Sequence, residues 1–286
     1  MNHTIRQRIA RIVLPVMRRA ARSYIAGPEL GDALAMARTL GARDMASTIA
    51  FWDEDGAAPG DVLNACLKSA QALGSEGLDC YLSVKAPSLQ YSAEALLQLI
   101  DQCECRKTRL HFDALGVDSA DPTRALLEAL LPRYANISFT LPGRWARSLE
   151  DADWAVQRGV GVRVVKGQWP DPAMPQRDPH KGFLEVIERL AGGARSVAVA
   201  THNPTLAAPA LQRLMKAGTP CELELLFGLP SKAVLRIAAA MGVRTRIYVP
   251  YGYGWLPYSL SQARKNPKIF WWMLKDAMLR RPEAAI

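Results

Sequence analysis

Apolar and polar positions alternate along this chain in blocks that predict short strands separated by helices. Short runs rich in β-branched and aromatic residues are typical of buried strands, and apolar positions three and four apart are typical of helices. The segments with the strand pattern are eight in number: 46–52, 80–85, 108–113, 136–141, 160–166, 197–203, 221–226 and 245–250. The helical pattern marks 30–40, 61–72, 93–103, 124–131, 149–157, 183–190, 206–215 and 232–241.

The spacing of the strand candidates indicates how they pair. They recur at intervals of roughly 24 to 36 residues, which is the size of a parallel strand with its crossover helix. Alternating strands and helices also permit an open doubly wound sheet. However, neither G-x-G-x-x-G nor G-x-x-x-x-G-K-[ST] follows any strand, and eight units are the number that fills a closed barrel. The sequence therefore predicts an α/β fold, a (β/α)8 barrel of the TIM type over residues 44–286.

Residues 1–43 are predicted to form a basic helical arm before the barrel. The opening segment carries arginines and no acid: Arg6, Arg8, Arg11, Arg18, Arg19 and Arg22. Such an arm lies on the domain with its arginines in solvent, or it makes peripheral contact with an anionic membrane face. The net charge of +9 does not by itself predict nucleic-acid binding, because the sequence shows no basic groove lined with aromatic residues and no known nucleic-acid-binding module.

Composition places the chain in the cytoplasm. At 286 residues and 49% hydrophobic residues it can bury a large core, yet no run of 18 uncharged apolar residues predicts a membrane span. The five cysteines are odd in number and scattered, so they do not form a disulfide framework and indicate a reducing compartment.

Polar residues gather where the predicted strands end. In such a barrel the active site lies at the carboxyl ends of the strands, so these residues should share one rim. They are Glu54, Lys85, Asp113, Arg163, Lys166, Thr201, His202, Asn203, Glu224 and Tyr248.

Three kinds of chemistry compete for this rim. A metal site is disfavoured, because the chain has only four histidines and no H-x-H, so no metal ligand is assigned. A Schiff base on Lys85 or Lys166 needs a desolvated amine. The third is an anionic planar cofactor, whose charge Arg163 and Lys166 would neutralise while the Thr201–Asn203 loop donates hydrogen bonds.

Several motifs together resemble the FAD-dependent proline dehydrogenase family. They are VRVVKGQW, ATHN, ELELLFG, YVPYG, WLPYSL, the late Trp271-Trp272, and the early RSYIAG and TIAFWDED, all in that family's order. The resemblance covers about residues 20 to 275. It implies a barrel that binds FAD, takes a hydride from the carbon beside the proline nitrogen and passes electrons to a quinone.

The resemblance also implies roles for individual residues. Arg163 matches the arginine over the flavin N5, and Lys166, Gly167 and Gln168 fall in the cofactor-holding motif. Thr201, His202, Asn203 and Glu224 match cofactor-side positions, and Asp113 and Tyr248 match a pair that meets near the flavin. Lys85, Asp113 and Arg163 are therefore the predicted catalytic residues. On the substrate side, Lys85 matches a lysine, Tyr258 an aromatic wall and Glu54 a gate.

The chain departs from the family pattern at three places. Ser261 and Gln262 stand where the family has a pair of arginines that clamp the substrate carboxylate. Leu141-Pro142-Gly143-Arg144 stands for L-Q-A-Y, and Ala50 replaces an acid. Arg144, Arg264 or Lys265 are the cations near enough in sequence to replace the clamp.

The sequence thus predicts oxidation of proline, or of a related cyclic secondary amine, to an imine of the pyrroline-5-carboxylate type. Two alternatives stay open. One is oxidation of a modified or carrier-bound amine that needs no arginine pair, and the other is a degenerate flavin-binding partner protein without turnover.

Overall fold

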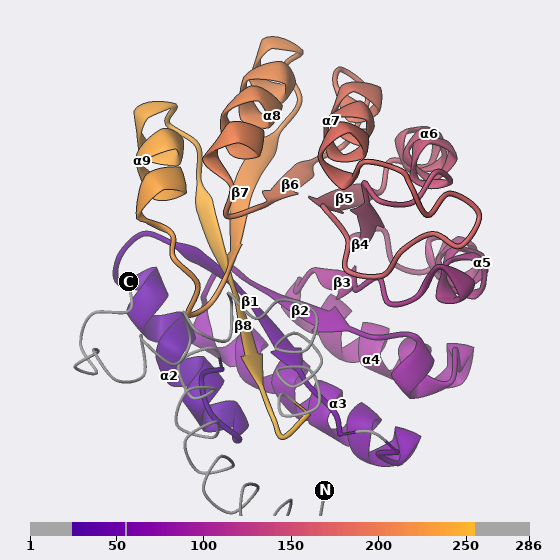
Figure 1. Cartoon of the computed structure of the whole chain (residues 1–286). Helices are drawn as coiled ribbons and strands as arrows, with labels where there is room; N and C mark the ends of the chain where they lie inside the picture. The colour runs from indigo at the N-terminus through magenta and orange to yellow at the C-terminus, as the bar shows by residue number, and fades with distance from the viewer. Residues whose placement is uncertain (1–24, 55, 255–286) are drawn as a thin grey trace, which may run out of the picture.

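The computed structural model describes residues 25–54 and 56–254, which form a closed parallel barrel (Figure 1). Each strand pairs with the next along the chain, and β1 closes the ring by pairing with β8. The strands are β1 Ala46–Phe51, β2 Cys80–Val84, β3 Leu110–Phe112, β4 Ile137–Pro142, β5 Gly161–Val165, β6 Val197–Ala200, β7 Cys221–Leu226 and β8 Thr245–Tyr251. The predicted (β/α)8 fold is confirmed.

Helices surround the barrel and connect successive strands. They are α2 Leu30–Gly41, α3 Pro59–Glu76, α4 Ala93–Arg106, α5 Ala120–Leu130, α6 Ser148–Arg158, α7 Pro179–Leu190, α8 Pro204–Lys216 and α9 Lys232–Ala240. Single 3-10 turns, η1 Pro87–Leu89 and η2 Val117–Ser119, precede α4 and α5. Side-chain caps begin several helices: Ser92 accepts from the Ala95 amide, Asp178 from His180, and Asn203 from Thr205.

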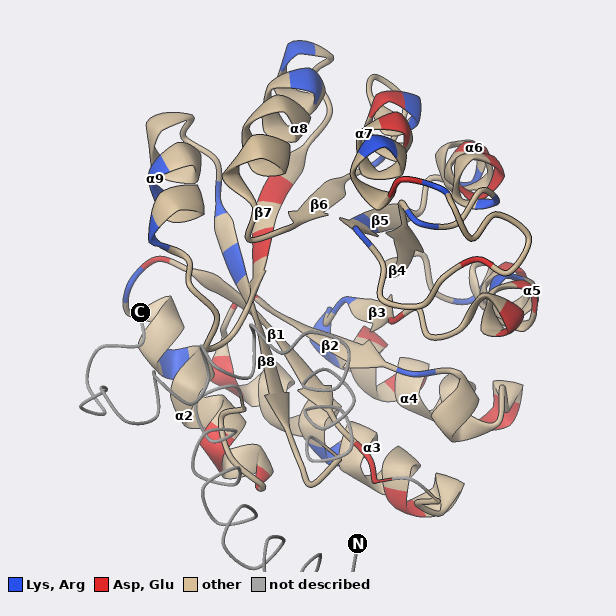
Figure 2. Ribbon diagram, in the orientation of Figure 1, with Lys and Arg blue, Asp and Glu red and all other residues tan. Residues whose placement is uncertain are grey.

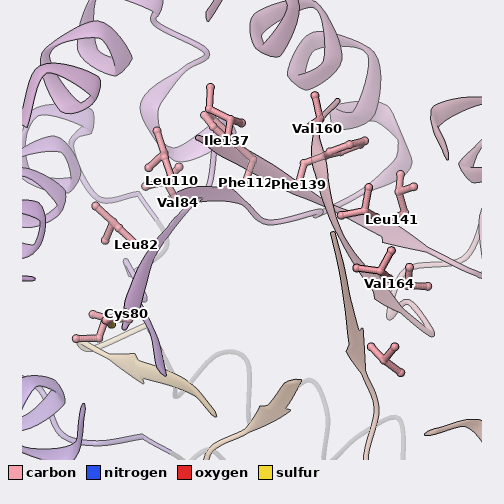
Figure 3. Close-up of a cluster of buried hydrophobic side chains, with 14 of the residues drawn as sticks. Cys80, Leu82, Val84, Leu110, Phe112, Ile137, Phe139, Leu141, Val160 and Val164 are labelled. Atoms are coloured by element: carbon pink, nitrogen blue, oxygen red, sulfur yellow. The ribbon is translucent and has the colours of Figure 1, made fainter. Parts of the chain in front are cut away.

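The core lies between the barrel and its helices. Because side chains alternate along a strand, one set from each strand points outward to meet the apolar faces of the helices. Figure 3 shows this set on β2 to β5, and it includes Leu82, Leu110, Phe139 and Val164, all buried. Phe139 also meets the indole of Trp154 on α6 edge to face, with ring centroids 5.5 Å apart.

Helix α2 belongs to the helical layer although it precedes β1. It packs against β1 and β8 and stands between α9 and α3 in the ring (Figure 1). The Ala26 amide donates to the Pro250 carbonyl at 3.0 Å, which fixes the entry of the chain beside β8. The predicted boundary at residue 43 stays a prediction, and the basic part of the arm lies outside the described residues. Within the described part, no helix has the length and apolarity needed to cross a bilayer.

Candidate active site

The inside of the barrel is lined by polar and charged side chains. Barrels of this kind are usually filled by branched apolar residues. Here β5, β7 and β8 carry charged residues (Figure 2), and their side chains pair with one another across strands. They form two networks at different heights. The mouth network, at the carboxyl ends of the strands, comprises Arg163, Glu224, Asp113 and Tyr248. The floor network, at the opposite end, comprises Arg246, Glu222, Asp79 and Tyr81.

Arg163 is the centre of the mouth network. Its Nε and Nη2 donate to the two carboxylate oxygens of Glu224 at 2.7 and 2.6 Å, and its Nη1 donates to Asp113 Oδ1 at 2.7 Å. The Tyr248 hydroxyl donates to the other Asp113 oxygen at 2.7 Å, and its ring lies 5.0 Å from the Arg163 guanidinium carbon. Four strands that are far apart in sequence thus hold one rigid constellation.

Burial and charge together fix the protonation of these groups. Desolvation alone would lower the pKa of Arg163, but the charges of Glu224 and Asp113 outweigh it and raise the pKa above its ordinary value. Desolvation, together with the charge of Asp113, holds the pKa of Tyr248 well above its usual range. The phenol is therefore neutral and serves as a hydrogen-bond donor to Asp113.

A buried histidine supports this network from below. His111 lies on β3 two residues before Asp113, and its ring nitrogens lie 2.8 Å from the hydroxyls of Ser138 and Thr140 on β4. Desolvation and the charge of Arg163 lower the pKa of His111 well below its usual value. A neutral ring therefore sits 3.8 Å from Asp113 without competing for its charge. The sequence prediction did not assign a role to His111.

Lys85 lies beside the mouth and is held by an acid that the sequence analysis did not select. Its ammonium donates to Asp53 Oδ1 at 2.6 Å, and the Ser88 hydroxyl donates to Asp53 Oδ2 at 2.8 Å. Desolvation opposes ionisation of Asp53, but the charge and hydrogen bonds of Lys85 and Ser88 lower its pKa overall. Glu54, the residue predicted to be a gate, is exposed. Asp53 directly follows the predicted strand 46–52, and this position at the predicted rim could have identified it as a site residue.

The loop after β6 is tightly bound to its own surroundings. His202 Nδ1 lies 2.9 Å from the Pro230 carbonyl, and the Leu226 amide donates to His202 Nε2 at 2.9 Å. Both ring nitrogens are thus engaged with backbone, which fixes the loop after β6 to the end of β7. Thr201 accepts from the Asn203 amide, and Asn203 caps α8. The amides at the start of α8 consequently face the rim side of the barrel.

Lys166 and Gly167 follow β5 at the same edge. Lys166 is exposed, and Gly167 has a φ of +93°, a conformation that favours glycine. A Cβ at Gly167 would also lie 2.8 Å from the Pro142 Cβ and 3.1 Å from the Arg144 Cβ. The backbone after β5 therefore passes directly against the end of β4. Gln168 comes next and is half-buried.

Three predicted substrate residues, Tyr258, Ser261 and Gln262, lie outside the described residues. The rest of the predicted site divides into two groups. Asp113, Arg163, Glu224 and Tyr248 are in direct contact, while Lys85, Lys166, Thr201, His202 and Asn203 lie after their strands around the same rim. Within the described chain, no three His, Cys, Asp or Glu side chains are grouped as metal ligands would be.

The floor network has the same kind of chemistry but different access. Arg246 donates to Glu222 at 2.8 Å and to Asp79 at 2.9 Å, and its guanidinium carbon lies 3.4 Å above the Tyr81 ring. Beside it, a cavity of about 160 Å³ extends from Arg109 and Cys221 up to His111, Arg163 and Glu224. The barrel is therefore hollow between its two charged networks.

The mouth is suited to positioning and electrostatic stabilisation more than to nucleophilic attack. Burial raises the pKa values of the Cys66 and Cys103 thiols to about 12, so neither is an activated nucleophile. What the mouth offers is a buried, permanently charged guanidinium, a neutral phenol and a lysine with a carboxylate partner. Such a set can orient a bound ring and stabilise negative charge that develops on it.

Comparison with known proteins finds named proteins that are similar to this chain. No family model matches the chain. Proline dehydrogenase 1 of Bacillus subtilis subsp. natto is 24% identical over 279 residues, which cover 91% of each chain. Proline dehydrogenase 2 of B. subtilis strain 168 is 20% identical over 264 residues and 87% of each chain. The protein named proline dehydrogenase from Deinococcus radiodurans is 20% identical over 284 residues, covering 92% of this chain and 91% of its own.

Solved structures show the same fold. Proline utilization A of Bdellovibrio bacteriovorus, inactivated by N-propargylglycine, superposes with a TM-score of 0.75 at 18% identity over 93% of this chain. Proline utilization A of Corynebacterium freiburgense gives 0.71 at 18% identity over 100% of this chain. The chain spans 33% and 36% of those two proteins, so it corresponds to one part of each. The resemblance seen in the motifs is confirmed: over most of its length, this chain is similar to proteins named proline dehydrogenase, at 20–24% identity.

Proposed function

We propose that this protein is a flavin-dependent dehydrogenase that oxidises proline, or a closely related cyclic secondary amine, to the corresponding imine. The observation that carries the proposal is the mouth network around Arg163, which stands at the catalytic end of a barrel whose relatives are named proline dehydrogenase. The enzyme class is an oxidoreductase acting on CH–NH donors.

The mouth meets the main demand of the proposed reaction, which is positioning. A hydride moves efficiently when the donor carbon is held about 3 to 3.5 Å from its acceptor. Arg163 is fixed by three charge-assisted hydrogen bonds, and Asp113 is fixed by Arg163 and Tyr248. Because these side chains are already ordered, binding of a ring against them costs little reorganisation.

Lys85 is proposed to act on the substrate amine. An amine releases a hydride from its neighbouring carbon only when its nitrogen is unprotonated, and a nearby cation disfavours the protonated form. The ion pair with Asp53 holds the Lys85 ammonium beside the mouth, and its side chain is 19% exposed. Lys85 is therefore placed to disfavour the protonated form of the substrate amine, and Asp53 and Ser88 are its positioning residues.

The residues fit the flavin cofactor, FAD, that the resemblance implies. A bound flavin would supply the hydride acceptor, and the electrons would leave to a quinone-type acceptor. In this proposal Arg163, Glu224 and Tyr248 hold the redox ring. Lys166, Gly167 and Gln168 hold the cofactor from the end of β5, and Thr201, His202 and Asn203 shape the wall after β6. The exposed Lys166 ammonium supports this assignment, since cations at such a position suit the phosphates of a dinucleotide.

A second candidate substrate follows from the sequence. Ser261 and Gln262 stand where relatives of this family would carry two carboxylate-binding arginines. An amine whose carboxylate is modified or attached to a carrier needs no such clamp. This candidate keeps the flavin chemistry and changes only the substrate.

An absorption spectrum with a substrate panel tests the proposal. We expect the purified full-length chain to be yellow and its flavin absorbance to bleach when proline is added without oxygen. Pyrrolidine, N-methylproline and proline amide serve as comparison substrates. Bleaching by proline amide but not by proline would move the assignment to the modified amine. A yellow protein that no amine bleaches, or a colourless protein that gains no absorbance with added FAD, would overturn the dehydrogenase assignment.

A further inference from the structure

The end of β4 is built differently from the other strand ends around the mouth. A turn follows Pro142, because the Trp145 amide donates to the Pro142 carbonyl at 3.1 Å. Within that turn, the Gly143 amide donates to the Val165 carbonyl at 2.8 Å and the Arg144 amide donates to the Lys166 carbonyl at 3.1 Å. The backbone of Arg144 is thereby fixed beside the cofactor-side motif that follows β5.

Within the described residues, the side chain of Arg144 makes no ion pair, unlike Lys85, Arg163 and Arg177. Lys85 pairs with Asp53, Arg163 pairs with Glu224 and Asp113, and Arg177 pairs with Glu185. Among residues 25–54 and 56–254, no carboxylate lies within ion-pair distance of Arg144. Its Nε is also fully buried and makes no hydrogen bond.

A buried donor without an acceptor is costly. Leaving a charged donor unpaired in this way typically costs more free energy than the donor would contribute when bonded. An apolar side chain of similar length would fill the same space without that cost. Arg144 is therefore poorly explained as a stabilising residue. Arg144 as a whole is half-buried and its two terminal amines are not among the buried unpaired atoms, so an acceptor that arrives with a ligand can reach them.

The surroundings indicate what kind of acceptor this is. Lys166, whose backbone bonds to Arg144, is a second cation without an ion pair among the described residues. Gly167 packs directly against the Cβ atoms of Pro142 and Arg144, so the loop that carries Lys166 lies against the Arg144 turn. Two cations beside a glycine suit a carboxylate or a phosphate, which a guanidinium binds with two parallel hydrogen bonds.

We propose that Arg144 is the oxyanion-binding residue of the mouth and donates to a carboxylate or a phosphate of the bound ligand. The inference rests on the proposed function for the identity of that ligand, because an amino-acid substrate carries the carboxylate and a dinucleotide cofactor carries the phosphates. The Arg144 guanidinium binds a carboxylate or a phosphate through the same kind of hydrogen bonds, and the Lys166 ammonium adds a second positive charge beside it.

The test compares three variants of the full-length chain. Arg144→Met removes the guanidinium and keeps the apolar stem, and Arg144→Lys keeps the charge. Arg236→Met is the matched control, because Arg236 is an exposed arginine on α9, which stands across the barrel from β4 (Figure 1). Dissociation constants are measured by calorimetry or flavin fluorescence for two ligand pairs. FAD is paired with riboflavin, which lacks phosphates. Cyclopentanecarboxylate is paired with cyclopentylmethanol, which lacks the carboxylate.

We expect Arg144→Met to weaken one charged member of these pairs by roughly 10- to 100-fold and to leave its neutral partner unchanged. A selective loss for FAD identifies the phosphate, and a selective loss for cyclopentanecarboxylate identifies the carboxylate. Arg144→Lys should recover part of the affinity, and Arg236→Met should change none of the four constants. Thermal unfolding of Arg144→Met should occur at or above the wild-type temperature, because a buried orphan donor has been removed.

Equal losses for the charged and neutral members, unchanged affinities, or a wild type that binds neither charged ligand would overturn the inference. None of these measurements uses turnover. Failure of proline to bleach a bound flavin would therefore refute the proposed function. The ratio of dissociation constants within each ligand pair would still test the role of Arg144.

Discussion

The two charged networks inside the barrel are built alike and are used differently. In each, one buried arginine bridges two carboxylates beside a tyrosine ring: Arg163 at the mouth and Arg246 at the floor. The floor arginine also donates to the Ser47 carbonyl at 2.6 Å. The mouth arginine has no backbone partner among the described residues. Every bond of the mouth network is made by a side chain.

The difference shows which features mark a site inside a polar barrel. Burial, ion pairing and a raised arginine pKa occur in both networks, so none of them distinguishes function. What distinguishes the mouth is its position at the carboxyl ends of the strands and a donor phenol directed at Asp113. Neighbouring cations occur at both ends, because Arg109 and Arg244 lie beside the floor network. The floor network stabilises the closure of the barrel, since it joins β1, β2, β7 and β8.

The largest expected effect is on stability, and both networks should show it. Arg163→Met leaves Glu224 and Asp113 without their shared cation, and Arg246→Met leaves Glu222 without one, while Asp79 keeps its pair with Arg244 at 3.0 Å. We expect a loss of about 3–5 kcal/mol in the free energy of unfolding for either variant, because an uncompensated buried charge remains. Urea unfolding followed by circular dichroism measures it. A loss confined to one variant would show that the two networks are not energetically equivalent.

Substitution by lysine should separate the networks. Lysine keeps the charge but cannot make the paired donation to Glu224 or the bridge between two carboxylates, so each variant should lose about 1.5–3 kcal/mol of stability. Arg163→Lys should also slow flavin reduction by about 100-fold, because the bound flavin ring would then be held slightly away from its reactive position. Arg246→Lys should leave the reduction rate unchanged. Anaerobic stopped-flow reduction measures both, and equal slowing in the two variants would refute the assignment of function to the mouth.

Much of the fold could be predicted because the strand signals are local. The predicted strand 221–226 is the observed β7, and the predicted 46–52 is β1 with one extra residue. Helix starts were placed too late where proline occurs. Helices α3, α7 and α8 begin at Pro59, Pro179 and Pro204. A proline fits the first turn of a helix because the amide it lacks has no partner there.

The site could be predicted only in part. Asp113, Arg163, Glu224 and Tyr248 were identified from strand ends and motifs, and the structure brings them into contact. Asp53 and His111 were missed because their roles depend on which side chains face inward and on pairing across strands. The cofactor-side role of His202 stays a prediction, and the sequence did not indicate that both its ring nitrogens bond to backbone groups. Such pairings are decided by loop geometry, which no local sequence pattern specifies.

The tyrosines provide a finer comparison. Tyr248→Phe removes the hydrogen bond to Asp113 and the longer one, 3.3 Å, that the hydroxyl accepts from the Trp52 indole. Tyr81→Phe removes only a hydroxyl and keeps the ring under Arg246. We expect Tyr248→Phe to cost about 1 kcal/mol of stability and to slow flavin reduction several-fold, by about the value of one hydrogen bond. Tyr81→Phe should change neither. If the two variants behave alike in unfolding and in reduction, the phenol at the mouth has no special role.

The smallest effect concerns the acid beside the mouth and depends on pH. Asp53 has a pKa below its ordinary value in the folded protein, so the unfolded chain binds more protons as the pH falls. The stability that the Asp53–Lys85 pair contributes is therefore present above about pH 4, the ordinary pKa of an aspartate, and is lost as the pH falls through the folded pKa. At pH 7, Asp53→Asn should cost about 1 kcal/mol relative to wild type, and that difference should shrink progressively as the pH falls below about 4. Ser88→Ala, which removes one hydrogen bond and no charge, should show a smaller loss at pH 7. Because the pair lies outside the Arg163 network, a difference for Asp53→Asn that does not shrink as the pH falls would mean that Asp53 stabilises the mouth by packing and not by its charge.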